Sequence, residues 1–126
     1  DMETIGEVLQ VLMQMSGQEK ASAFAEEELM MAKKVGDHKR EAFAQQKMAA
    51  AMAMQDRPRE AIRRATESME QLREIGDLKG EAKAAQLLVE LQCQAKRMAD
   101  AKRAAKDAQR LFKELGDIKG AVNVLQ

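Results

Sequence analysis

The sequence predicts an all-α solenoid built from antiparallel helix pairs, and three observations support this fold class. The dipeptide Gly-Asp recurs at Gly36, Gly76 and Gly116, with a constant spacing of 40 residues. Aromatic residues make up only 2% of the chain, which has 10 methionines and neither tryptophan nor tyrosine. The segments between the dipeptides consist of strong helix formers, with few β-branched residues. A fixed period of this length is typical of stacked repeat units.

The Gly-Asp dipeptides are predicted to join consecutive units. Glycine readily adopts the left-handed conformation that ends a helix, and aspartate caps the N-terminus of the next helix. The units are therefore 1–35, 36–75 and 76–115, followed by the start of a fourth at 116–126. Together they form a single domain, 1–126, with about three repeats plus a trailing helix. Because that last helix lacks a partner helix, we expect the chain to be a fragment of a longer array.

A second break is predicted inside each unit. In the first unit, Ser16 and Glu19 form a capping box. In the second unit, Asp56 is the expected N-cap and Pro58 lies in the first helical turn. The third unit has no local breaker, and only its register with the other two predicts a turn at 94–97. The predicted helices are 4–15, 17–35, 38–55, 57–75, 78–94, 97–115 and 118–126.

Apolar residues recur with the same period, and we expect them to form the buried stripe of each helix. Small residues four apart allow a neighbouring backbone to approach closely, and larger apolar residues fill the rest of the stripe. The aligned sets are Ala21, Ala61 and Ala101; Ala25, Ala65 and Ala105; Val8, Met48 and Leu88; Ala32, Leu72 and Phe112; and Val35, Ile75 and Leu115.

The charge balance narrows the class of partner. The chain has 21 basic and 21 acidic residues, so its net charge is zero. This balance disfavours nucleic acid and anionic membranes as partners, and no apolar run is long enough for a transmembrane segment. The single cysteine excludes an internal disulfide framework and favours a reducing compartment, such as the cytoplasm or an organelle interior, without identifying it.

The residues that could support catalysis are few. His38 and Cys93 are the only histidine and cysteine, and we expect His38 to pack partly at a helix start and Cys93 to be a small packing or groove residue. The acidic run 26–28 and the basic helix 96–113 are interpreted as solvated faces, although the basic helix could also meet an acidic partner or phosphate. We therefore expect no enzyme activity, no catalytic residue, no cofactor and no metal ion.

These repeats resemble tetratricopeptide repeats, in a variant with a period of 40 residues. The conserved places of the family's two helices are occupied here mainly by methionine, glutamine and alanine, and the family's aromatic residues are missing. The first-helix places are Ile5, Val8, Leu9 and Leu12; Gln45, Met48, Ala49 and Met52; and Ala85, Leu88, Val89 and Gln92. The second-helix places are Ala21, Ala25 and Glu28; Ala61, Ala65 and Ser68; and Ala101, Ala105 and Ala108.

The resemblance implies a right-handed superhelix whose concave face holds a peptide or helix of a partner protein. Members that grip a terminal carboxylate use a cluster of basic residues and asparagine on this face, whereas here only Lys83 is present, beside Glu90. An apolar or amide-rich partner is therefore favoured over an acidic tail. Projected onto this chain, the concave face comprises Gln10, Met13, Gln14, Phe43, Gln46, Ala50, Met54, Lys83, Gln86, Glu90 and Cys93.

The predicted function is that of a protein–protein interaction module, an adaptor or scaffold. The alternative is a structural or peripheral subunit of a large multiprotein assembly, held by its outer faces and ends. A third class is an array attached to an enzyme or regulatory domain. The residues Met30, Met31 and Met54 do not fit one buried stripe, so a methionine-lined docking surface also remains open.

Overall fold

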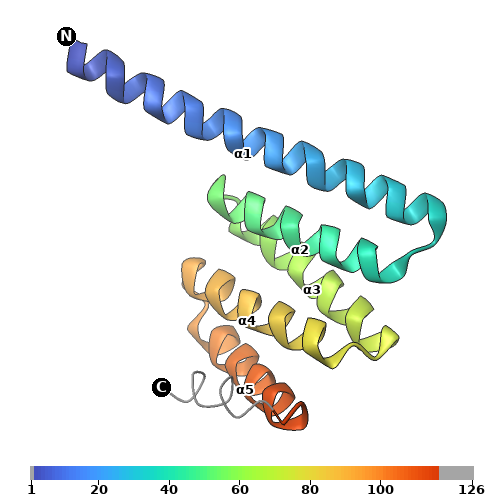
Figure 1. The fold of residues 1–126 in the computed structure, drawn as a ribbon. Coiled ribbons are helices and arrows are strands. Elements are labelled where there is room, and N and C mark those ends of the chain that lie inside the picture. Colours follow the sequence, from blue (N-terminus) through green and yellow to red (C-terminus); the bar gives the residue numbers. More distant parts are fainter. Residues whose placement is uncertain (1, 117–126) are drawn as a thin grey trace.

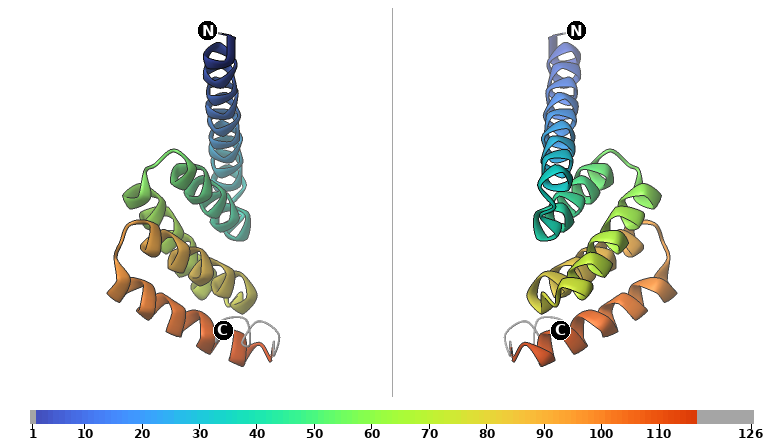
Figure 2. Two further views of the ribbon diagram at one scale, coloured as in Figure 1. Left: turned by 90° about the vertical axis from the view of Figure 1, so that its left-hand side faces the viewer. Right: turned by 90° about the vertical axis from the view of Figure 1, so that its right-hand side faces the viewer.

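The chain folds as a series of α-helices that follow one another in space in sequence order (Figures 1 and 2). The computed structural model describes residues 2–116, without the side chains of 2, 3, 12–16 and 18 in the first helix. Within this range it contains five helices and no strand. The helices are α1 (Met2–Val35), α2 (His38–Met54), α3 (Pro58–Ile75), α4 (Leu78–Gln94) and α5 (Met98–Glu114).

Each helix packs against the next one in the chain, from α1 on α2 to α4 on α5. Short turns reverse the chain direction between them, so that successive helices are antiparallel (Figure 1). This arrangement confirms the predicted fold class, an all-α helical repeat. The predicted helix at 118–126 lies outside the described residues.

The core of the array consists largely of alanine. Among the residues whose burial is described, alanine accounts for 13 of the 21 buried hydrophobic residues, so helix backbones can approach closely but each contact buries little apolar area. The largest fully buried apolar side chains are Met48, Leu72, Leu91 and Leu111. Met69 is half-buried and packs against all three core clusters, which joins them into a continuous interior.

The Gly-Asp turns have the predicted geometry. Gly76 has a left-handed φ of 85°, its N–H donates to Arg73 O at 3.1 Å, and the N–H of Asp77 donates to Leu72 O at 2.9 Å. These two bonds form a Schellman motif, which satisfies carbonyls at the end of α3. Gly36 has a φ of 73° and ends α1 with the same pair of bonds. Asp37 and Asp77 each accept a hydrogen bond from the backbone N–H three residues later, which confirms their role as N-caps.

The turns inside the units use the same motif without glycine. Asp56 and Lys96 have φ values of 59° and 60°, and the N–H groups of the residues that follow them donate to Met52 O and Gln92 O, five residues earlier in the chain. The prediction that Asp56 is an N-cap is therefore wrong, because it occupies the left-handed position and Arg57 precedes the helix. The turn at 94–97 is confirmed, as is Pro58 in the first turn of α3.

The first unit differs from the prediction. The helices expected at 4–15 and 17–35 form one continuous helix, α1, and no break follows the proposed capping box of Ser16 and Glu19. Glycine at position 17 lowers helix propensity but does not interrupt the hydrogen-bonded ladder. As a result, the N-terminal half of α1 projects beyond the other four helices (Figure 1).

The aligned apolar sets are buried unevenly. The set of Ala32, Leu72 and Phe112 is buried in all three units, as predicted. The last set, Val35, Ile75 and Leu115, is exposed throughout, so its expected place in the buried stripe is wrong. Val35 and Ile75 are the last residues of α1 and α3, and Leu115 follows α5; each lies just before a left-handed glycine, where the described helices leave it exposed. In the other sets, Ala21 and Val8 of the first unit are exposed and Ala105 is half-buried, whereas the remaining members are buried.

A buried polar network that the sequence analysis did not predict links α2 to α3. Gln45, in the place where the tetratricopeptide pattern has a large apolar residue, is almost fully buried. Its amide nitrogen donates to Glu67 at 3.1 Å, and its amide oxygen accepts from Arg64 at 3.0 Å. Both polar ends of the amide therefore have partners, which removes most of the cost of burying it.

The left-handed lysine at position 96 gives a stability prediction. The left-handed conformation costs a non-glycine residue about 1–2 kcal/mol. Glycine removes this cost, but it also raises the conformational entropy of the unfolded chain, which offsets part of the gain. We expect Lys96→Gly to raise the free energy of unfolding by about 0.5–1 kcal/mol, measured by urea denaturation followed by circular dichroism.

Lys102→Gly is the matched control, because Lys102 is an exposed residue inside α5. There the same substitution should lower the free energy of unfolding by about 1 kcal/mol. A loss of stability in both variants would contradict the left-handed turn.

Candidate protein-interaction face

Helices α2 and α4 run side by side in the same direction. At their N-terminal ends, Lys39 Nζ lies 3.3 Å from Asp77 Oδ2, and Gln46 Nε2 donates to Gly80 O at 3.5 Å. At their C-terminal ends, Gln94 Nε2 donates to Ala53 O at 3.1 Å. These polar links fix the two first helices of the second and third units next to each other.

Eight of the predicted concave-face residues belong to these two helices, where their spacing of three and four residues places each group of four on one side of its helix. Phe43 and Gln46 are half-buried and the other six are exposed. We refer to this set as the α2–α4 face: Phe43, Gln46, Ala50, Met54, Lys83, Gln86, Glu90 and Cys93.

The remaining three predicted residues, Gln10, Met13 and Gln14, are not part of this face. They belong to the projecting half of α1 (Figure 1), because α1 does not turn where the sequence predicted a break. Gln10 is exposed, and the side chains of Met13 and Gln14 lie outside the described part of the chain.

A shallow hollow lies at the N-terminal end of the α2–α4 face. It has a volume of about 230 Å³ and is lined by Phe43, Gly80, three lysines and one aspartate. The charged residues are Lys39, Lys79, Lys83 and Asp77, which give a net charge of three minus one, or plus two. The sequence analysis counted Lys83 alone as a basic residue here, although the recurrence of lysine two residues after each Gly-Asp could have indicated the other two.

Asp77, one of the residues that line this hollow, contacts both α4 and Lys39. Its Oδ1 accepts a hydrogen bond from Gly80 N–H at 3.0 Å, and Lys39 lies close to its second oxygen. The backbone hydrogen bond from Gly80, together with the positive charge of Lys39, lowers the pKa of Asp77 below its ordinary value. Its carboxylate therefore caps α4 and holds the start of α4 beside α2.

The histidine and the cysteine lie on exposed surfaces. His38 is exposed, with its Nδ1 at 3.6 Å from Glu41, so the predicted packing at the helix start is wrong. Cys93 is exposed at the end of α4, where it fits the predicted groove position. Among the described residues, no group of three or more histidine, cysteine or acidic side chains is arranged to hold a metal ion.

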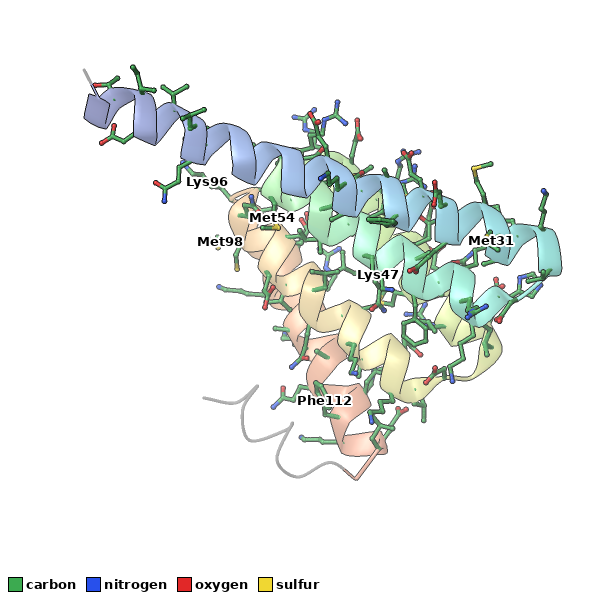
Figure 3. The ribbon with its side chains drawn as sticks, turned by 45° about the horizontal axis from the view of Figure 1, so that its top comes forward. Met31, Lys47, Met54, Lys96, Met98 and Phe112 are labelled. Atoms are coloured by element: carbon green, nitrogen blue, oxygen red, sulfur yellow. The ribbon has the colours of Figure 1, made fainter. Side chains whose placement is uncertain are left out.

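The charged helix α5 has the solvated face that its sequence indicated. Its basic residues are exposed, and Arg103 and Arg110 form ion pairs with acidic residues one helical turn away. The three methionines that fitted no stripe, Met30, Met31 and Met54, are all exposed. Figure 3 shows that Met31, near the C-terminal end of α1, and Met54, at the C-terminal end of α2, lie at opposite ends of the helix array.

No protein-family model matches the chain, and no curated protein matches its sequence. Among the described helices, none combines the length and apolar character needed to cross a membrane. The resemblance to tetratricopeptide repeats therefore depends on the residues quoted above.

The lowered pKa of Asp77 predicts a pH-dependent contribution to stability. Because the folded-state pKa lies below the unfolded value, the stabilisation is present above the unfolded pKa and is lost as the pH falls through the folded pKa. We expect Asp77→Ala to lower the free energy of unfolding by about 1 kcal/mol at neutral pH, with a smaller difference in acid, measured by urea denaturation at several pH values.

Asp77→Asn separates the cap from the charge, since asparagine caps helices as well as aspartate does. We expect this variant to retain most of the stability, because Lys39 is largely exposed and such ion pairs contribute little. A pH-independent effect of Asp77→Ala would show that the negative charge of Asp77 does not contribute to the stability.

Proposed function

We propose that the chain is a protein–protein interaction module of the tetratricopeptide type, an adaptor or scaffold that binds a partner helix or peptide along the α2–α4 face. The observation that carries the proposal is the set of exposed side chains on two parallel helices held in fixed register. Because polar contacts join α2 and α4 at both ends, the surface is preformed, which lowers the entropy cost of ordering it on binding.

The composition of the face supports a partner with apolar and amide side chains. Phe43, Ala50 and Met54 follow one another along α2, and Gln46 and Gln86 add hydrogen-bonding groups beside them. The lysine hollow adds a place for one carboxylate at the N-terminal end of the face. A short amphipathic helix with an acidic residue near one end fits this pattern.

The proposal can be tested with a displayed library of amphipathic helical peptides selected against the 126-residue chain. We expect the selected peptides to bind at least tenfold more weakly to Ala50→Arg, a loss of about 1.4 kcal/mol, because the new side chain fills the middle of the α2–α4 face. Binding is measured by fluorescence anisotropy of the labelled peptides.

Ala99→Arg is the matched control, since Ala99 is also an exposed helical alanine but lies on α5. Binding to this variant should equal binding to the unmodified chain. Peptides that bind both variants equally, or a selection that yields no peptide above background, would contradict the proposed face.

The alternative function, a structural subunit of a larger assembly, is favoured by a separate observation. Large apolar side chains outside the set of α2–α4 face residues are also exposed, most of them on α1; these include Phe24, Met30, Met31 and Val35. Several exposed large apolar side chains on one helix favour a contact with another protein.

A thermal melt followed by circular dichroism and light scattering distinguishes the two functions. For the adaptor, we expect a cooperative loss of helicity from a species of discrete mass, because an independent module completes its own core. A helical species that melts without cooperativity and scatters as a broad distribution would favour the assembly subunit.

A further inference from the structure

The groove between α1 and α2 is open on one side. It forms a hollow of about 400 Å³, lined on α1 by Glu28, Met31 and Ala32 and on α2 by Arg40 and Phe43. The α1–α2 groove, as we call it, is distinct from the lysine hollow, although Phe43 borders both. Met31 and Lys47, which both line this groove, are labelled in Figure 3.

The equivalent groove one repeat later is filled. Adding the period of 40 to Glu28, Met31 and Arg40 gives Ser68 and Gln71 of α3 and Gly80 of α4, and all three of these residues contact α2. The N-terminal half of α2 therefore occupies the α3–α4 groove. The contacts are Ser68 Oγ to Ala42 O at 2.7 Å, Gln71 Nε2 to Glu41 Oε1 at 3.2 Å, and Gln46 Nε2 to Gly80 O at 3.5 Å.

The period also identifies the segment that matches the open groove. Subtracting 40 from residues 42–54 of α2 gives residues 2–14, which lie in the projecting half of α1. The turns support the same register, because left-handed residues occur every 20 positions. They are Gly36, Asp56, Gly76, Lys96 and Gly116. One further step back reaches residue 16, where α1 continues without a turn.

Residues 2–14 have the apolar pattern needed to fill the α1–α2 groove. Ile5, Val8, Leu9 and Val11 are 52–59% exposed. Their equivalents in α2 are Gln45, Met48, Ala49 and Ala51, all of which are at most 5% exposed. The segment 2–14 therefore exposes side chains at the positions that, in α2, are buried in the α3–α4 groove. Leaving them in water forgoes about 25 cal/mol per Å² of apolar area.

The charges of the segment also suit the groove. Residues 2–14 contain two glutamates, Glu3 and Glu7, and no lysine or arginine. The α2 wall of the groove supplies Arg40 and Lys47. Lys47 also pairs with Glu28 of α1 at 3.0 Å, which links the two helices that form the groove.

We propose that the α1–α2 groove receives residues 2–14 of a second copy of the chain. The continuous α1 carries each segment away from its own groove (Figure 1), so a segment can fill a groove only in another molecule. Reciprocal exchange gives a closed, two-fold symmetric dimer in which both grooves are filled. Phe43 is the α2–α4 face residue that also lines the α1–α2 groove. The exchange does not depend on the proposed function.

The oligomeric state of the 126-residue chain tests the proposal. We expect light scattering coupled to size exclusion to give a mass twice the chain mass of 14.0 kDa. Val8→Asp and Leu9→Asp should each reduce it to 14.0 kDa, because a carboxylate would be buried in the groove. Both side chains are exposed within one molecule, so circular dichroism should show helicity preserved.

Gln10→Asp is the matched control, because its equivalent in α2 is the exposed Ala50. This variant should keep the dimeric mass. A monomeric unmodified chain would overturn the proposal, as would a dimer whose mass is unaffected by Val8→Asp and Leu9→Asp.

Disulfide trapping identifies the occupant independently. Met2 and Glu28 are the equivalents of the contacting pair Ala42 and Ser68, and Cys93→Ser removes the native thiol from all variants. A mixture of the single variants Met2→Cys and Glu28→Cys should form a cross-linked dimer on oxidation. A monomeric intrachain disulfide in the double variant, with no cross-link in the mixture, would show that the segment folds back on its own groove and would overturn the exchange.

The two proposals can fail separately. Loss of the dimer in Val8→Asp without loss of peptide binding would leave the α2–α4 face intact. Loss of peptide binding in Ala50→Arg with the dimeric mass retained would contradict the proposed function alone.

Discussion

The left-handed turn that ends each helix is the constraint on which the rest of the structure depends. Five such residues occur at intervals of 20, from Gly36 to Gly116. Each of the four turns between helices is closed by the same two backbone hydrogen bonds, and glycine is present at only two of those four. The constant interval fixes the lengths of α2 to α5, sets their alternating direction and brings residues 40 apart into equivalent positions.

A core made mainly of alanine explains why polar contacts are prominent between the helices. Alanine lets backbones approach closely but buries little area, so side chains with hydrogen-bonding groups fix the register. Ser68 donates to the backbone of α2, and Gln45 joins Arg64 and Glu67 inside the α2–α3 contact. Glu81, buried near the start of α4, is paired with Arg73 at 3.0 Å. These contacts are directional and so specify one arrangement where apolar packing is thin.

The fold determines which surfaces are available for binding. Helices α2 and α4 lie parallel because each begins after a Gly-Asp turn and each packs on α3. Their outward residues therefore form one face, with three lysines gathered at its N-terminal end. Helix α1 follows a different course, since it lacks the internal turn of the later units and leaves apolar residues uncovered. The proposed binding face and the proposed exchange of segments follow from these two consequences.

The sequence by itself determined the fold class, the Gly-Asp turns, the turn at 94–97 and the two helices, α2 and α4, on which eight of the predicted face residues lie. All of these follow from the 40-residue period, which can be recognised in the sequence without knowledge of tertiary contacts. Only the tertiary structure decided that α1 is continuous, that Asp56 is left-handed and that Lys39 and Lys79 join Lys83. Ser16 and Gly17 lower helix propensity without ending α1, because tertiary packing can override local propensity in deciding where a helix ends. The lysine cluster likewise depends on two helices 40 residues apart meeting side by side, a distance that no local propensity encodes.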